Sequence, residues 1–161
     1  MPSIPGQGMR TWAVYGEQIF ETLKSYHDGR YSAFSQLVRA TFDEALSKFP
    51  DGTIDLLHID GTHFYEDVKH DFESWLPKLS QRGVVLFHDI NQKDRGFGVY
   101  KYWDELKSRY PYFEFAHGHG LGVLGVGPAN VQPSNLFAAS ADPALCQQIN
   151  GLQSSRIGRC R

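Results

Sequence analysis

Hydrophobic and polar residues alternate along the chain in blocks that predict strands and helices in turn. The runs Ile54–Ile59 and 84–87 are short and apolar, which is typical of buried strands. Between them, apolar residues recur every three or four positions and predict a helix over residues 64–79. The apolar positions of this helix are Tyr65, Val68, Phe72, Trp75, Leu76 and Leu79.

Two further segments continue this order. Residues 99–106 carry apolar side chains at helical spacing and predict another helix. The runs 113–115 and 121–124 flank the glycine-rich sequence His117-Gly-His-Gly120, which predicts an antiparallel hairpin. This alternation of strands and helices predicts an α/β fold whose parallel strands are joined by right-handed crossovers.

The pattern before the first strand is weaker. Residues 16–26 have helical periodicity, whereas residues 11–15 and 34–39 have the composition of short strands. Thr41 begins the sequence Thr-Phe-Asp-Glu, which predicts a capping box at the start of a short helix.

We expect one α/β domain over residues 11–127. At 161 residues, the chain is long enough for one domain with a real core. Residues 1–10 are rich in Pro and Gly, which favours an irregular segment. Residues 128–161 are polar and weakly patterned, so we interpret them as a tail with one short helix over 143–149.

Composition and charge exclude several classes of partner. The formal net charge is −2 and the basic residues are scattered, so nothing indicates binding to nucleic acid or to a membrane surface. No segment approaches the roughly 18 apolar residues of a membrane span. Two cysteines, Cys146 and Cys160, match no zinc or redox spacing. These features predict a cytoplasmic protein.

Acidic residues follow both central strands directly. Asp60 directly follows the run Ile54–Ile59. Asp89 follows His88, which is the residue after the run 84–87. If the two strands are parallel neighbours, both carboxylates emerge at the same sheet edge, about 5 Å apart. Carboxylates this close repel each other unless a cation or a proton lies between them. A small set of oxygen ligands favours Mg²⁺.

Histidines accompany these carboxylates. His63 precedes the predicted helix over 64–79, where the helix dipole disfavours imidazolium and suits a neutral base. The alternatives are structural: Asp60 as a helix-capping turn residue, and His88 with Asp89 as the start of a loop. His58 lies inside a strand, where a hydrogen-bonded core histidine is the simpler interpretation.

The segment IDLLHIDGTHFYEDVKHDFESWLPKLSQRGVVLFHDI resembles class I S-adenosylmethionine-dependent methyltransferases. It is most similar to bacterial sugar and macrolide O-methyltransferases, which have an IDGxH strand end and a later VV strand that ends in Asp. The resemblance covers residues 11–127 and implies a Rossmann-like, mostly parallel sheet with a C-terminal antiparallel hairpin.

The resemblance also implies roles for particular residues. Asp60, His88 and Asp89 would hold Mg²⁺, with His88 at a position that is often acidic in the family. His63 would deprotonate a hydroxyl of a sugar or glycosylated metabolite. The residues implied in binding S-adenosylmethionine are Thr41, Asp60 and Gly61.

One part of the family pattern has no counterpart in this sequence. The family begins with a strand and an acidic, glycine-rich loop that holds the cofactor, and Gly6-Gln-Gly8 is too short to replace them. We therefore expect an N-terminally truncated methyltransferase sheet, in which the strand Ile54–Ile59 lacks a neighbour. Residues 11–15, a second copy in a homodimer, or the rest of a longer protein would supply that neighbour.

Two other functions stay open. The first is a non-catalytic interaction module with the same fold, which would dimerise and bind no cofactor. The second is a metal-dependent hydrolase with Asp60, His63, His88 and Asp89 around Zn²⁺ or Mn²⁺. The order of the helices and the hairpin favours a methyltransferase over the hydrolase.

Overall fold

The computed structural model describes residues 7–94, 96–131 and 135–157. The chain forms two compact units that divide between Ala40 and Thr41. The second unit holds the sheet and all four residues of the predicted Asp/His site. None of the described helices is long and apolar enough to cross a membrane.

The first unit consists of one long helix and the loop that follows it. Helix α1 spans Gln7–Tyr31, so the strand predicted over 11–15 is wrong, and residues 7–10 are helical rather than irregular. The predicted irregular residues 1–6 lie outside the described part. Residues 35–39 form no strand. Helical propensity continued over a long segment outweighs a short stretch of β-formers, because each added helical residue adds a hydrogen bond.

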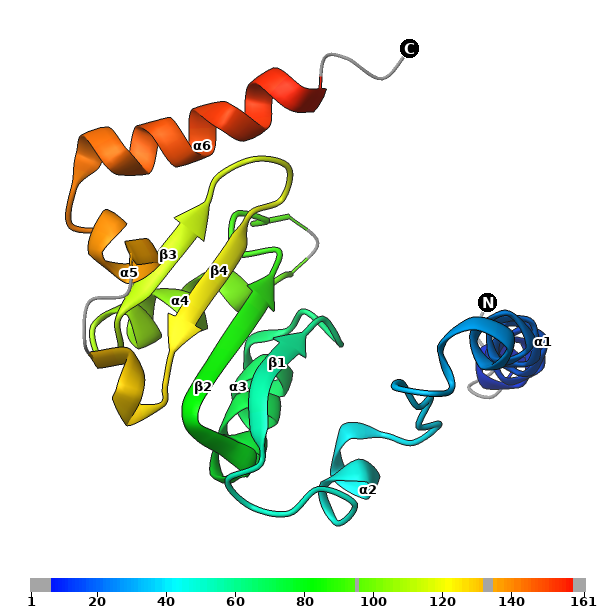
Figure 1. The fold of residues 1–161 in the computed structure, drawn as a ribbon. Coiled ribbons are helices and arrows are strands. Elements are labelled where there is room, and N and C mark those ends of the chain that lie inside the picture. The colour runs from blue at the N-terminus through cyan, green and yellow to red at the C-terminus, as the bar shows by residue number, and fades with distance from the viewer. Residues whose placement is uncertain (1–6, 95, 132–134, 158–161) are drawn as a thin grey trace. The chain divides into compact units, whose positions relative to one another are not determined.

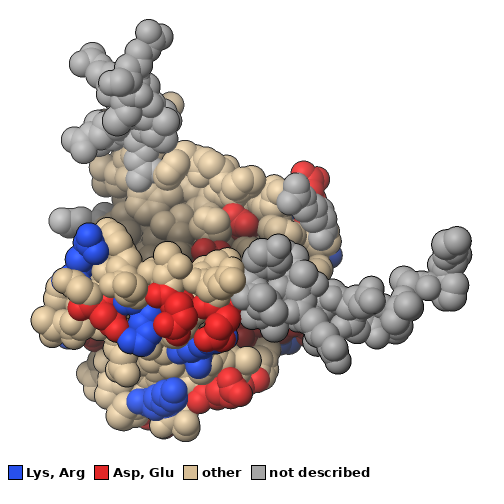
Figure 2. All heavy atoms as spheres, turned by 90° about the vertical axis from the view of Figure 1, so that its right-hand side faces the viewer, with Lys and Arg blue, Asp and Glu red and all other residues tan. Residues whose placement is uncertain are grey.

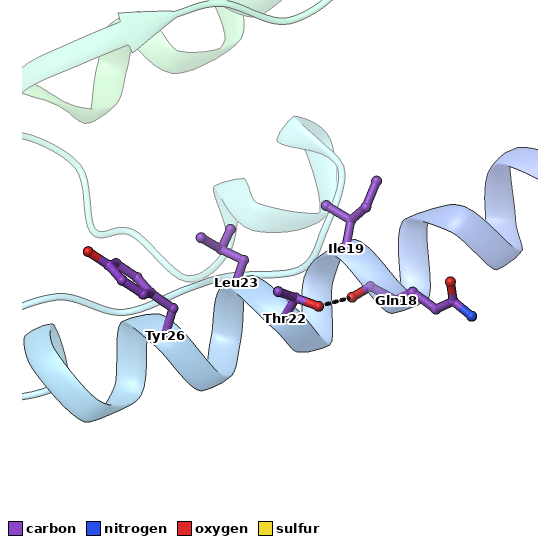
Figure 3. A pocket seen from close by; sticks show the side chains of 5 residues that line it. All are labelled: Gln18, Ile19, Thr22, Leu23 and Tyr26. Carbon is purple, nitrogen blue, oxygen red and sulfur yellow. Dashed lines mark hydrogen bonds between the residues drawn. The ribbon is translucent and has the colours of Figure 1, made fainter.

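Helix α1 exposes an apolar stripe. Ile19, Leu23 and Tyr26 follow one another at helical spacing and are all exposed (Figure 3). Nearby, the Thr22 hydroxyl donates to the Gln18 carbonyl at 2.8 Å. The helix end is tied to its loop by buried His27, whose Nε2 lies 3.0 Å from the Ser35 hydroxyl.

The second unit is built on a four-stranded sheet in the order β1-β2-β4-β3 (Figure 1). Strand β1 (Ile54–Ile59) runs parallel to β2 (Leu79–His88). Strand β4 (Leu121–Gly125) pairs antiparallel with β2 and with β3 (Tyr112–Phe115), which confirms the predicted hairpin. Of the three pairings among the described strands only one is parallel, so the sheet is mixed rather than mostly parallel.

Helices before and after β1 follow the predicted order. Helix α2 (Phe42–Leu46) begins with the predicted capping box, in which the Thr41 hydroxyl accepts from Glu44 N and the Glu44 carboxylate accepts from Thr41 N. Helix α3 spans Tyr65–Trp75 and continues as a 3₁₀ turn, η1, over Leu76–Lys78. The α-helix is shorter than predicted because Pro77 lacks the N–H that would continue its hydrogen bonds.

One face of the sheet is covered by α3 and by α4 (Val99–Lys107), which lie behind the sheet in Figure 1. Phe87 of β2 packs between Phe72 of α3 and Trp103 of α4, with ring centroids 5.6 and 5.5 Å apart. The fully buried residues here, each under 2% exposed, include Val68, Val85, Phe87, Tyr102 and Leu106. This apolar layer holds β2 rigidly in the centre of the unit.

The opposite face carries the segment that we predicted as a polar tail. It forms η2 (Pro128–Val131), α5 (Asn135–Ala139) and α6 (Pro143–Ile157), and α5 lies beside β3 in Figure 1. Phe137 and Ala139 are buried against Phe113 and Val123. The tail prediction is therefore wrong for the described residues, except for its short helix over 143–149, which lies within α6. The segment docks because its scattered apolar side chains pack on this face, namely Leu136, Phe137, Ala139, Cys146 and Ile149. Residues 132–134 and 158–161 lie outside the described part.

Strand β1 is less buried than its apolar sequence predicts. Ile59 is 4% exposed, but Leu56 is 60% exposed. The cause is position, since β1 is the edge strand of the described sheet and Leu56 projects from the face opposite α3. The prediction of a strand is confirmed, and the prediction of its burial is wrong.

Candidate functional site

The parallel pairing of β1 and β2 brings their carboxyl ends to the same edge of the sheet. Ile59 lies opposite Phe87 in the register, so Asp60 follows β1 beside the point where β2 reaches His88 and Asp89. His63 lies three residues after Asp60, just before α3 begins at Tyr65. The structure thus brings together the four candidate residues that the sequence predicts, Asp60, His63, His88 and Asp89.

The two histidines and the two aspartates lie around one centre, and each imidazole contacts both carboxylates. His88 Nδ1 lies 3.2 Å from Asp60 Oδ1 and 3.0 Å from Asp89 Oδ1. His63 Nε2 lies 3.4 Å from Asp60 Oδ1 and 3.3 Å from Asp89 Oδ2. We call this group the Asp/His cluster. Within it, ligand atoms of Asp60, His63 and His88 lie within 4.8 Å of one another.

Several polar atoms of the cluster are buried without a hydrogen bond. They are His63 Nε2, His88 Nδ1 and Asp89 Oδ1. A buried polar atom without a partner costs about 1–3 kcal/mol, so three at one point need an explanation. If both imidazoles are neutral with their lone pairs inward, only acceptors converge here, and a bound cation would satisfy them together.

Asp89 has an unusual backbone. Its φ angle of 61° lies in the left-handed region, and it is the only non-glycine residue with positive φ among those described. The Asp89 N–H donates to the Gly120 carbonyl at 3.1 Å. The residue is only 8% exposed. Strained backbone that packing maintains is found mostly at functional sites.

His63 packs against Phe97 and Gly98, a contact that the sequence does not predict. Its ring stacks on Phe97 with centroids 4.6 Å apart and planes 5° apart. The N–H of Gly98 donates to the His63 carbonyl at 2.7 Å. Gly98 is needed here because a Cβ would lie 2.5 Å from the Tyr65 backbone nitrogen. No pattern in the sequence links residues 97–98 to His63, since the contact depends on how the loop folds back.

A hollow of about 450 Å³ opens beside His88. It is lined by His58, His88, His117, His119 and a few apolar and glycine positions, among them Leu86 and Leu121. His58 is exposed here rather than a core histidine, so that interpretation is wrong. The hairpin turn is fixed at the rim, since Asn91 N donates to the His119 carbonyl at 2.9 Å.

The three residues expected to bind the cofactor, Thr41, Asp60 and Gly61, do not all lie in the Asp/His cluster. Thr41 uses its hydroxyl to cap α2, and neither Thr41 nor Gly61 lines the hollow beside His88. Gly61 faces the Asp71 carboxyl, which a Cβ would approach to 3.4 Å, and burial raises the pKa of Asp71. Only Asp60 of this group lies in the Asp/His cluster. The cofactor roles of these residues stay predictions.

The fold and the cluster define an α/β domain with a polar site at the carboxyl ends of two parallel strands. A family model described as a methyltransferase domain matches residues 8–90, just over half of the chain and all of the Asp/His cluster. The chain therefore belongs to the methyltransferase-domain family.

Two individual proteins are also similar. The uncharacterized protein y4gI of Sinorhizobium fredii is 51% identical over 118 residues, which is 73% of this chain and 13% of that protein. The chain thus spans a small part of this relative's length. A crystal structure of a Corynebacterium glutamicum protein from a structural genomics consortium matches with a TM-score of 0.45 and 20% identity, covering 61% of this chain and 52% of that one.

Proposed function

We propose that this domain transfers the methyl group of S-adenosylmethionine to a hydroxyl of a small molecule such as a sugar or glycosylated metabolite. The observation that carries the proposal is the Asp/His cluster, where buried polar atoms without hydrogen bonds converge in a methyltransferase-family chain. The family match favours this function over a hydrolase or a non-catalytic module.

The cluster fits a divalent cation. Asp60, His88 and Asp89 would hold it through atoms that already lie 3.0–3.2 Å apart around His88 Nδ1. A cation at this position would orient the acceptor hydroxyl and lower its pKa. The acceptor would lie in the adjoining hollow, whose imidazoles can hydrogen-bond hydroxyls and whose leucines can pack against the apolar face of a sugar ring.

His63 is the proposed general base. Its Nε2 faces the cluster and has no hydrogen bond, so it is free to take the hydroxyl proton. S-adenosylmethionine, when bound, would supply the methyl group, which the hydroxyl oxygen would take in line as the C–O bond forms and the C–S bond breaks with its electron pair staying on sulfur. The resulting imidazolium is stabilised by the Asp60 and Asp89 carboxylates at 3.4 and 3.3 Å.

The exposed edge of β1 suggests a further partner. No described strand pairs with this edge, and Leu56 beside it is 60% exposed. We propose that a longer form of the protein, comparable to the much longer S. fredii relative, supplies a strand here and completes the cofactor site. A second copy of the chain is the alternative. The free thiol of Cys146 is compatible with the cytoplasmic location that we propose.

Calorimetry with S-adenosylhomocysteine, followed by a methyl-transfer assay on a panel of sugars and glycosides, tests this function. We expect binding by the longest natural form of the chain, and we expect His63→Gln to lower turnover by about 10²–10⁴-fold. His70→Gln, which changes an exposed histidine outside both the Asp/His cluster and the hollow, is the matched control. Absence of binding at about 1 mM ligand in both the 161-residue chain and the longer form would contradict the proposal.

A further inference from the structure

We infer that His88 makes the Asp/His cluster select a cation that accepts imidazole nitrogen, with Mn²⁺ preferred over Mg²⁺. The inference rests on the cation site of the proposed function and names the class of ion that this particular donor set binds. It departs from the Mg²⁺ that the family resemblance implies.

The spacing of the donor atoms is close to that of a formed coordination site. An ion with metal–ligand bonds of about 2.0–2.2 Å places adjacent octahedral donors roughly 2.8–3.1 Å apart and tetrahedral donors somewhat farther apart. The distances from His88 Nδ1 to Asp60 Oδ1 and Asp89 Oδ1 are 3.2 and 3.0 Å. An ion can therefore enter with little movement of these side chains.

The direction of the His88 ring supports its role as a ligand. Its Nδ1 faces the two carboxylates and is buried without a hydrogen bond. Asp89 faces the same centre and is only 8% exposed, and its Oδ1 also lacks a hydrogen bond. A carboxylate oxygen and a neutral imidazole nitrogen that face each other at 3.0 Å are both acceptors, and a cation between them would satisfy both.

The donor types decide which ion is favoured. Mg²⁺ binds through carboxylates and retained waters in strict octahedral geometry, and nitrogen donors suit it poorly. Imidazole suits Zn²⁺, Fe²⁺ and Ni²⁺ best, and Mn²⁺ is the weakest binder of the first transition row. Mn²⁺ nevertheless accepts an imidazole beside carboxylates more readily than Mg²⁺ does. In this cluster one of the three proposed ligands is imidazole, and His63 Nε2 lies 3.4 Å from Asp60 as a second nitrogen near the ion. Mn²⁺ resembles Mg²⁺ in charge and ligand preference apart from nitrogen, so the comparison of these two ions reports the effect of nitrogen ligands, and the His88 variant separates the part of His88.

The test is titration calorimetry of the chelator-treated full chain with Mn²⁺ and, separately, Mg²⁺, without any methyl donor. We expect the wild-type chain to bind Mn²⁺ at least about 10-fold more tightly than Mg²⁺. His88→Asp should reduce this ratio by about 10-fold or more, because it replaces nitrogen by a hard oxygen donor. His70→Ala, which removes an exposed histidine outside both the cluster and the hollow, should leave the ratio unchanged.

A spectroscopic measurement on the wild-type chain makes the test independent of how the variants fold. Pulsed electron paramagnetic resonance of bound Mn²⁺ should show coupling to ¹⁴N. Equal affinities for the two ions, an unchanged ratio in a folded His88→Asp variant, or no ¹⁴N coupling would each overturn the inference. Binding of S-adenosylhomocysteine is measured separately, so loss of ion selectivity with intact binding contradicts only this inference, and the reverse contradicts only the proposed function.

Discussion

Strands β1 and β2 are paired neighbours with similar apolar sequences, yet their surroundings differ. In β2, Val85 and Phe87 are 0% exposed, because strands flank β2 on both sides and helices cover it. In β1, Leu56 is 60% exposed, since β1 is at the edge of the described sheet. The comparison teaches that an apolar run predicts a strand, while its neighbours in the sheet determine burial.

The two strands nevertheless contribute to one site. Strand β1 leads into Asp60 and His63, and β2 leads into His88 and Asp89. Asp89, after β2, has the strained backbone and the least exposed side chain of the four at 11%, whereas the side chains of Asp60, His63 and His88 are 25–45% exposed. A complete site therefore depends on how well the exposed strand is held beside the buried one.

The largest expected effect is the difference in the free energy of unfolding between a substitution in β2 and one in β1. Phe87→Ala should lower the free energy of unfolding by about 3–5 kcal/mol, because it leaves a cavity between Phe72 and Trp103. Leu56→Ala should change it by no more than about 0.5 kcal/mol, because the side chain is already exposed. Urea denaturation of both variants checks this.

A loss of about 2 kcal/mol or more for Leu56→Ala would break the comparison. It would mean that β1 is covered in solution by a second copy, which light scattering would detect. Phe87→Leu, which keeps most of the volume, is the control in case the alanine variant does not fold.

A smaller effect concerns the strain at the end of β2. Asp89→Gly should raise the free energy of unfolding of the metal-free protein by about 1 kcal/mol, because glycine adopts a φ of 61° without steric cost. The same variant should lose Mn²⁺ binding. Thermal unfolding and calorimetry measure the two effects, and Asp89→Asn, which tolerates this backbone better than most residues, is the control. An Asp89→Gly variant no more stable than Asp89→Asn, which also removes the carboxylate charge, would show that the backbone there is not strained.

The smallest effect lies beside β1, where α2 and α3 meet. The pKa of His70 is raised, mainly by its hydrogen bond to the Asp43 carboxylate at 2.8 Å. A raised pKa stabilises the folded state fully below the unfolded value of about 6.5, and this contribution disappears as the pH rises through the folded value. His70→Gln should therefore lower the melting temperature slightly at about pH 5.5 and leave it unchanged at about pH 9. An equal loss at both pH values would show that the ion pair contributes nothing.

Much of this architecture follows from the sequence, since periodicity predicts it. Strand β2, helices α3 and α4 and the hairpin were predicted because apolar spacing reports the buried face. The meeting of Asp60 and Asp89 was predicted because the carboxyl ends of parallel strands share one edge. These are features that local patterns or topology determine.

Other features depend on tertiary contacts that no local pattern reports. The stacking of His63 on Phe97 and the left-handed backbone of Asp89 arise only when loops fold over the sheet. The docking of residues 135–157 is not predicted by the sequence, because its packing residues Leu136, Phe137, Cys146 and Ile149 are scattered among polar positions. Residues 11–15 were assigned wrongly because β-propensity over five positions is a weaker signal than the long helix that contains them.

The most direct test of the account is the position of a bound metal. Crystals of the chain soaked in Mn²⁺ should give one strong anomalous peak at the manganese edge, within about 2.0–2.3 Å of Asp60, His88 and Asp89. No peak in the Asp/His cluster at saturating Mn²⁺, or a peak only at the His117–His119 turn, would contradict the claim that these side chains form one cation-assisted reaction site.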